Sequence, residues 1–472
     1  MTGELRVVAI ADADSFVKWA ASLLDAVPGI RRHMLLVRTP LTVSREQEHM
    51  ALAGTCIGDT SVTRVGFDEV AGWLRGHLPD VVVLAGRGPF VRLIARVIDR
   101  LPQRPVVVSG LPGMSVPAQR GALEYRRESD LMVLHSHREI RAFEELGERL
   151  GMPVPTALAT LPYARTTTSS GAKVRSGGAV LGGATRDAVS SASSADAVAA
   201  SRSRGGVLVA ERERAVLGGT DLVFAAQALV PAERHEREAV VDMLRRAAAA
   251  RPNRRVVVKL RSRPGEAETH LERDAYTELL ADRPPNLVLS YEPMALALSR
   301  AEGLVTVSST AAVEAIARGV PVIALDTFGV HKPLLNTVFV GSGLLGGADE
   351  VIARRFRHPH PDWVRDNYFH PPAESDWWDR VQELVMLRRG GALPAKAVPA
   401  GRFGPLQAAW HRKSVLGAED RSLIGAVALG IGEPVVRGIL RTRRTRAGSD
   451  TWADPTTDFT LEPTPHKDPV RR

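Results

Sequence analysis

The chain has 472 residues, more than one hydrophobic core usually spans, so its length predicts two domains with extensions. Its 44% apolar and 24% charged residues are typical of a soluble globular protein, and its formal charge of +9 permits anionic partners without requiring them. The single cysteine, Cys56, excludes an internal disulfide framework and a cysteine-based zinc site. The N-terminus leads directly into a strand pattern, and no apolar run reaches about 18 residues, so we expect neither a signal peptide nor a membrane span.

The first part of the chain alternates between strand-like and helix-like patterns. Continuous apolar runs predict strands at residues 5–11, 34–37, 80–84, 105–109 and 130–134. Apolar residues at helical spacing predict helices at residues 15–27, 44–52, 67–77, 90–101 and 138–150. This alternation indicates a doubly wound parallel sheet, which ends in the proline-containing segment 151–164.

A second alternation follows a segment of different composition. Residues 165–205 are rich in Ser, Ala, Thr, Gly and Arg and predict a flexible linker or insertion. Strands are then predicted at residues 222–226, 255–260, 287–290, 304–307 and 320–325, and helices at 232–250, 270–281 and 376–389. The prediction is an α/β protein with Rossmann-like domains at 1–164 and 206–390, a cleft between them, and an extension at 391–472.

The most informative stretch is 304–325, a strand, a turn, a short helix and a second strand. The turn Ser308-Ser309-Thr310 brings three hydroxyls and several unpaired backbone N–H groups to the carboxyl end of a strand, where open α/β sheets bind ligands and helices bind phosphates. Glu314 shares a helix face with Thr310, from which a carboxylate could reach ribose hydroxyls. The alternative is structural, with the hydroxyls as helix caps and Glu314 paired with Arg318.

Residues 305–329, VTVSSTAAVEAIARGVPVIALDTFG, resemble the nucleotide-binding half of GT-B glycosyltransferases, closest to the capsule-polysaccharide and sialyltransferase-like branch. The resemblance implies a donor sugar nucleotide bound mainly by the second domain and an acceptor bound by the first. In place of that branch's Lys-x-His-Pro the chain has Lys259 followed by Arg261, which could hold a diphosphate. Asp326, after the next strand, is a candidate contact to the donor sugar.

Glycosyl transfer also needs a general base for the acceptor hydroxyl. Asp12 and Asp14 directly follow the first strand and are the best-placed candidates, although Asp14 also suits a helix cap and either could be a turn residue. His135 is a second choice, near His137. Two histidines two apart on a strand end point opposite ways and no third ligand follows, so we expect no metal site.

The sequence therefore predicts a metal-independent transferase that uses a nucleotide sugar as substrate, needs no cofactor, and acts on a glycan or lipid-linked acceptor. The alternatives are a nucleotide-sugar epimerase, whose Arg-Pro-Glu-type run is missing after 320–325, and a catalytically degenerate binding protein. Nucleic-acid binding is not expected, because no recognition motif accompanies the basic tail. The segment 423–440 and its arginines predict a tail packed on the body or, alternatively, one lying on an anionic membrane surface. The expected location is the cytoplasm, free or peripheral to the membrane.

Overall fold

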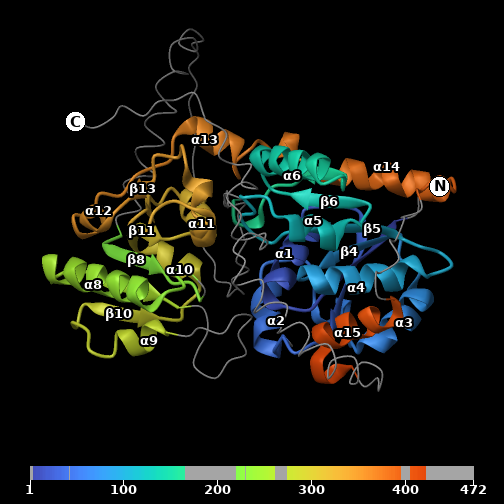
Figure 1. The fold of residues 1–472 in the computed structure, drawn as a ribbon, viewed down its shortest axis with the longest axis horizontal. Coiled ribbons are helices and arrows are strands. Elements are labelled where there is room, and N and C mark those ends of the chain that lie inside the picture. The colour runs from blue at the N-terminus through green and yellow to red at the C-terminus, as the bar shows by residue number, and fades with distance from the viewer. Residues whose placement is uncertain are drawn as a thin grey trace, which may run out of the picture.

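Two lobes lie side by side in the computed structural model, each built around one sheet with helices packed against it (Figure 1). The structure describes residues 4–41, 43–164, 219–228, 230–260, 274–394 and 404–420. All paired strands within each sheet run parallel. The predicted fold class, two doubly wound Rossmann-like domains, is thereby confirmed.

The first lobe contains a seven-stranded sheet in the order β3-β2-β1-β4-β5-β6-β7. Its strands are β1 (Leu5–Ala11), β2 (Ile30–Val37), β3 (Val62–Val65), β4 (Val81–Ala85), β5 (Val106–Gly110), β6 (Leu131–Leu134) and β7 (Thr156–Leu158). The helices that connect them are α1 (Asp14–Asp25), α2 (Arg45–Leu52), α3 (Val70–His77), α4 (Gly88–Asp99), α5 (Arg120–Arg126) and α6 (His137–Arg149).

The second lobe contains a six-stranded sheet in the order β10-β9-β8-β11-β12-β13. Its strands are β8 (Asp221–Ala225), β9 (Val256–Lys259), β10 (Leu287–Ser290), β11 (Ala301–Thr306), β12 (Val322–Leu325) and β13 (Leu345–Gly346). Its helices are α8 (Arg234–Ala250), α9 (Tyr276–Leu279), α10 (Met294–Ser299), α11 (Ala311–Ala317), α12 (Ala348–Ile352) and α13 (Pro361–Asp366).

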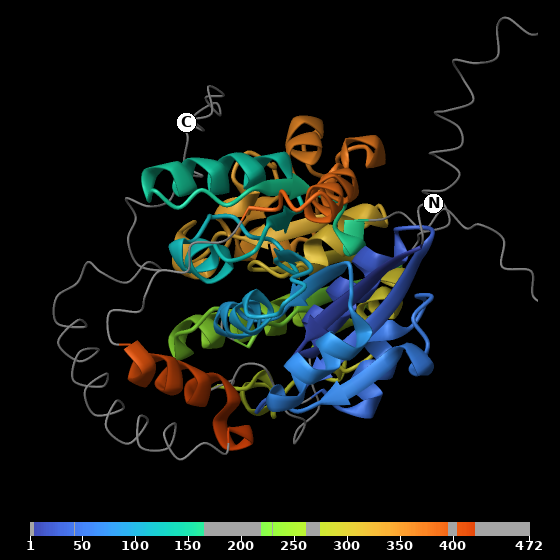
Figure 2. The ribbon, with the colours of Figure 1, turned by 90° about the vertical axis from the view of Figure 1, so that its right-hand side faces the viewer.

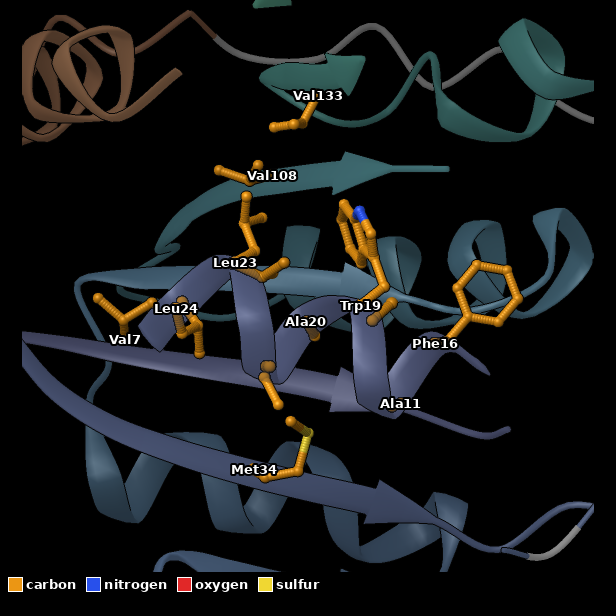
Figure 3. Packing of buried hydrophobic residues seen from close by; sticks show 14 of the residues in the cluster. Val7, Ala11, Phe16, Trp19, Ala20, Leu23, Leu24, Met34, Val108 and Val133 are labelled. Carbon is orange, nitrogen blue, oxygen red and sulfur yellow. The ribbon is translucent and has the colours of Figure 1, made fainter. Parts of the chain in front are cut away.

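The core of the first lobe explains why its central strands are apolar at nearly every position. Five of the seven residues of β1 are buried, because helices cover both faces of the sheet. On one face, α1 inserts Trp19 toward the strands that carry Val108 and Val133 (Figure 3). The Trp19 ring lies so close to Gly110 that a Cβ there would be 2.5 Å from the indole, so only glycine fits at the end of β5.

The helix α14 (Trp377–Arg389) packs on the first lobe, which corrects the prediction that it closes the second domain (Figure 1). Its buried residues Trp377 and Val381 join the core of the first sheet. At its start the Asp376 carboxylate accepts a hydrogen bond from the N–H of Leu158, at 2.8 Å, beside the end of β7. The chain therefore returns to the first lobe after completing the second.

The helix α15 (Gly404–Leu416) also packs on the first lobe, where Val415 and Leu416 join the core beside α4 (Figures 1 and 2). The predicted segment 423–440 and the tail beyond it lie outside the described residues. Within the described ranges, no helix is long and apolar enough to cross a lipid bilayer. The boundaries proposed for the domains and linker stay predictions.

The position of α14 makes a prediction about stability. Trp377 is 4% exposed, so Trp377→Ala should lower the free energy of unfolding by about 3–5 kcal/mol through the cavity it leaves. The control is Met386→Ala on the same helix, whose side chain is 63% exposed and whose loss should cost less than about 0.5 kcal/mol. Urea unfolding of both variants measures the difference, and equal effects would contradict the packing of α14 described above.

Candidate active site at the facing sheet edges

Each sheet has one point where the chain changes its direction of winding. In the first sheet this point lies between β1 and β4, and in the second between β8 and β11. Because the strands are parallel, all their carboxyl ends lie along one edge, and the crevice at such a switch point is where open α/β sheets bind ligands. The predicted residues Asp12 and Ser308 follow β1 and β11, so each lies at a switch point.

Asp12 is the most unusual side chain at the first switch point. The residue is 1% exposed, yet neither carboxylate oxygen has a hydrogen-bond partner among the described residues. The nearest opposite charge is the Arg87 guanidinium, 3.8 Å from Oδ2. Burial raises the pKa of the Asp12 carboxyl to about 6, and the charge of Arg87 offsets part of this rise. A carboxylate in this state suits proton transfer near neutral pH.

The other predicted base candidates differ from Asp12. Asp14 is the first residue of α1, and Ala13 occupies the cap position, so the prediction that Asp14 caps this helix is wrong. His135 is fully buried, and its Nε2 accepts a hydrogen bond from the Trp19 indole N–H at 2.8 Å. Its Nδ1 lies 2.8 Å from the carbonyl oxygen of Ala159, which assigns the proton to Nδ1. We do not retain His135 as a base, because both ring nitrogens already link parts of the first lobe.

At the second switch point, Gln227 connects the ends of β8 and β11. Its Oε1 accepts a hydrogen bond from the N–H of Ser308 at 2.9 Å, and its Nε2 donates to the Ser308 hydroxyl at 3.2 Å. In the sequence Gln227 directly follows the predicted strand 222–226, and no motif there indicates a role for it. The sequence feature that could have indicated a role is the position of Gln227, two residues after the end of β8, just as Ser308 lies two residues after the end of β11.

The turn before α11 satisfies most of its own backbone groups, which corrects the expectation of several unpaired N–H groups. The N–H of Ser309 donates to the Thr306 hydroxyl at 3.0 Å, and that of Ala311 donates to the Ser309 hydroxyl at 3.2 Å. Together with the Ser308 N–H bound to Gln227, this leaves only the Thr310 N–H without an acceptor in the described part of the turn.

Glu314 forms an ion pair with Arg318, with 3.3 Å between their side chains, as the structural alternative predicts. Lys259 ends β9 and is 8% exposed, and its ammonium donates to the Leu260 carbonyl. Asp326 directly follows β12, and its pKa is raised by partial burial and by the charge of Glu350. All three lie on the second lobe, and Lys259 and Asp326 share the strand edge at which Ser308 lies. Arg261 lies outside the described residues.

The two edges meet through the loop that follows β5. A Cβ at Gly113 would lie 2.8 Å from the Thr310 Cγ2, so the first lobe approaches the start of α11 closely. Met114 and Val116 of the same loop pack into the core of the second lobe. Asp12 and the Ser308-Ser309-Thr310 turn therefore belong to edges of the two lobes that face each other.

Glu139 joins the lobes from the interior. Its carboxylate accepts hydrogen bonds from the N–H groups of Ser115 and His135, at 2.7 and 2.8 Å, and from the Tyr368 hydroxyl of the second lobe, at 2.9 Å. Burial raises the pKa of the Glu139 carboxyl to about 7 against these hydrogen bonds, which favour the ionised form. On the surface, Arg141 and Asp366 add a bidentate ion pair between the lobes, at 2.7 and 2.8 Å.

Comparison with known proteins identifies the family. The family described as "Putative glycosyltransferase (DUF6716)" matches residues 7–384, which span both lobes and most of α14. The chain belongs to this glycosyltransferase family. No curated protein matches the sequence.

Solved structures are similar to this glycosyltransferase in fold. The UDP-GlcNAc 2-epimerase of Methanocaldococcus jannaschii in complex with UDP-GlcNAc and UDP has a TM-score of 0.50 and 13% identity, covering 80% of this chain and 99% of its own. The S. aureus MnaA–UDP structure has a TM-score of 0.47 and 11% identity, covering 84% and 99%. UGT2 of Phytolacca americana, complexed with UDP-2-fluoro-glucose and pterostilbene, has a TM-score of 0.38 and 12% identity, covering 80% and 94%. At such identities the likeness concerns the fold alone.

The burial of Asp12 predicts how the stability of the glycosyltransferase depends on pH. The pKa of the Asp12 carboxyl is higher in the folded chain than in the unfolded chain. The free energy of unfolding therefore falls as the pH rises from about 4 through about 6, because the buried carboxyl must then ionise. A pKa raised from 3.8 to about 6 corresponds to roughly 3 kcal/mol at neutral pH. Asp12→Asn should therefore be more stable than the wild type at pH 7 and similar to it at pH 4.

Urea unfolding at several pH values measures this difference. Glu139 titrates in an overlapping range, but it is present in both proteins, so its effect cancels when they are compared. An Asp12→Asn variant that is less stable than the wild type at pH 7 would show that the Asp12 carboxylate supports the fold.

Proposed function

We propose that this glycosyltransferase transfers a sugar from a nucleotide-activated donor to an acceptor hydroxyl without a metal ion, with Asp12 as the general base. The observation that carries this proposal is the buried carboxylate of Asp12, which has no hydrogen-bond partner in the described structure and lies at the switch point of the first sheet. A buried polar group without a partner costs about 1–3 kcal/mol, so its retention at this position fits a role in chemistry.

In the proposed reaction the acceptor O–H donates its proton to Asp12 while its oxygen attacks the anomeric carbon of the donor. The new C–O bond forms as the bond between that carbon and the donor phosphate oxygen breaks, and the phosphate departs with the electron pair. The Lys259 ammonium and the hydroxyls of Ser309 and Thr310, on the opposite lobe, are the groups proposed to stabilise the charge that develops on the phosphate. A protein cation and hydroxyls at this edge support a reaction without a metal.

The donor is proposed to bind along the edge of the second sheet, from Lys259 past the Ser308-Ser309-Thr310 turn to Asp326. Because Glu314 pairs with Arg318, a ribose contact from Glu314 would require this ion pair to open. The turn supports the capsule-polysaccharide and sialyltransferase-like branch as the proposed relationship. On that proposal the acceptor is a glycan or a lipid-linked sugar in the cytoplasm or at the inner face of the membrane.

Donor binding is tested by thermal unfolding with a panel of nucleoside diphosphates and CMP. One nucleotide should raise the melting temperature saturably, since a ligand at a hundred times its Kd stabilises the folded chain by about 2.7 kcal/mol. Lys259→Gln should weaken this nucleotide at least about tenfold through the loss of a charged hydrogen-bond donor. Arg246→Gln is the matched control, because Arg246 lies on α8 and pairs only with Asp242 among the described residues. A complete panel without any shift would favour the alternative of a degenerate binding protein.

The role of Asp12 is tested with the sugar nucleotide whose base the panel selects. In the presence of acceptor extracts, Asp12→Asn should reduce transfer by about 10²–10⁴-fold while nucleotide protection stays unchanged. EDTA should leave the wild-type rate unchanged. If NMR shows a C2 epimer of the donor as the product instead of transfer, the epimerase alternative replaces the proposal.

A further inference from the structure

The turn between β4 and α4 constrains the backbone of Arg87 at the first switch point. A Cβ at Gly86 would lie 2.2 Å from Phe90, and a Cβ at Gly88 would lie 2.5 Å from Tyr125, so neither glycine can be replaced without movement. The buried guanidinium of Arg126 also donates to the Gly86 carbonyl at 3.2 Å. The backbone on either side of Arg87 is therefore packed tightly.

The Arg87 guanidinium, in contrast, has unused donors. Its Nε is buried without a partner, and no hydrogen bond from its side chain is formed within the described part of the chain. Neighbouring arginines are occupied, since Arg92 donates to the Glu124 carbonyl at 2.8 Å and Arg96 pairs with Glu128 at 3.2 Å. A guanidinium has five N–H donors, and an arginine with a constrained backbone and none of these donors used within the described structure can bind an external acceptor.

The relation of Arg87 to Asp12 indicates what that external group is. The 3.8 Å between them gives charge attraction without a hydrogen bond, so the fork of the guanidinium is not taken up by this carboxylate. The Arg87 side chain is 40% exposed whereas that of Asp12 is 0% exposed. Arg87 is thus the accessible member of the pair, and planar guanidinium groups bind carboxylates and phosphates in a bidentate manner.

We propose that the acceptor of this glycosyltransferase carries an anionic group, a carboxylate or a phosphate, which binds to Arg87 while the accepting hydroxyl faces Asp12. This inference rests on the proposed function, because it takes Asp12 as the base. Arg87 then determines which acceptors bind, and one anionic group fixes the position of the hydroxyl next to it. The carboxylate would come from a sugar acid, and the phosphate from a phosphorylated sugar or a lipid-linked one.

The experiment compares three soluble probes, glucose, glucuronate and glucose 6-phosphate, in thermal unfolding of the full-length protein. Each probe is titrated alone and with the nucleotide that the donor panel selects. The expected result is saturable protection by glucuronate or glucose 6-phosphate at concentrations at least about tenfold below those at which glucose acts, as for one charge-assisted contact. The better of the two probes tells whether the group is a carboxylate or a phosphate.

The Arg87→Gln variant should lose this preference for anionic sugars. Because the Arg87 charge lowers the cost of burying the ionised Asp12 carboxylate, the unliganded variant should melt somewhat below the wild type at neutral pH, and protection is measured from each protein's own unliganded melting temperature. Arg87→Lys should restore part of the preference, since the charge is kept and the fork is lost. Arg246→Gln, which removes an arginine from the second lobe, should behave as the wild type.

Three outcomes would overturn the inference. The first is equal protection by glucose and both anionic sugars, or by none of them. The second is an anion preference that Arg87→Gln leaves unchanged. The third is a loss of nucleotide protection in Arg87→Gln, which would assign Arg87 to the donor phosphates. The nucleotide panel on the same wild-type sample separates the two proposals, because protection by a nucleotide without protection by anionic sugars leaves the donor site intact and removes only the anionic acceptor.

Discussion

A buried carboxylate with no hydrogen-bond partner in the described structure is the constraint on which the site depends. Asp12 directly follows the central strand β1, whose apolar residues are covered on both faces, so the carboxylate emerges from the most buried part of the first sheet. Neighbouring charge from Arg87 lowers the cost of this burial without removing it. The fold thus keeps a carboxylate without a hydrogen-bond donor at the switch point of the first sheet. At this point a ligand can contact loops from both halves of the sheet.

The relative placement of the two lobes depends on a different carboxylate. The Glu139 carboxylate accepts hydrogen bonds from the loops after β5 and β6 and from the Tyr368 hydroxyl. This side chain therefore links the strand edge that holds Asp12 to Tyr368 of the second lobe. The surface pair between Arg141 and Asp366 adds little by comparison, because exposed ion pairs are screened by water. The buried Glu139 contact, together with the packing of Met114 and Val116 into the second lobe, brings the two edges together, and a Cβ at Gly113 would not fit between them.

Most of the fold could be predicted from the sequence because its central strands are continuous apolar runs. The strands that sequence analysis missed are the edge strand β3, with one buried residue in four, and the short strands β7 and β13, whose composition carries no strand signal. The helices α5, α12, α13 and α15 were not predicted either; α5, for example, buries only Leu123 and Arg126 among its seven residues. Helical spacing could not predict the lobe on which α14 packs. It shows that one face of the helix is apolar but not which sheet covers that face.

The candidate site, too, could be predicted only in part from the sequence. Asp12 and Ser308 could be located because residues after parallel strands share an edge, whereas the pairing of Ser308 with Gln227, 81 residues away, is a tertiary contact without local signal. Arg87 is one arginine in an arginine-rich chain, and only the glycines on either side of it hint at a special turn. The self-satisfied turn before α11 could not be foreseen either, since serine and threonine hydroxyls serve equally well as ligand contacts and as internal caps.

The return of α14 to the first lobe means that the polypeptide passes between the lobes twice, once after residue 164 and once before Trp377. The two lobes are therefore joined by the chain at two places in the sequence. The two crossings also make the first lobe a discontinuous unit, completed by residues that are synthesised after the whole second lobe. A ribosome must therefore synthesise the chain through Arg389 before α14 can cover the first sheet, and through Leu416 before α15 can pack on the same lobe.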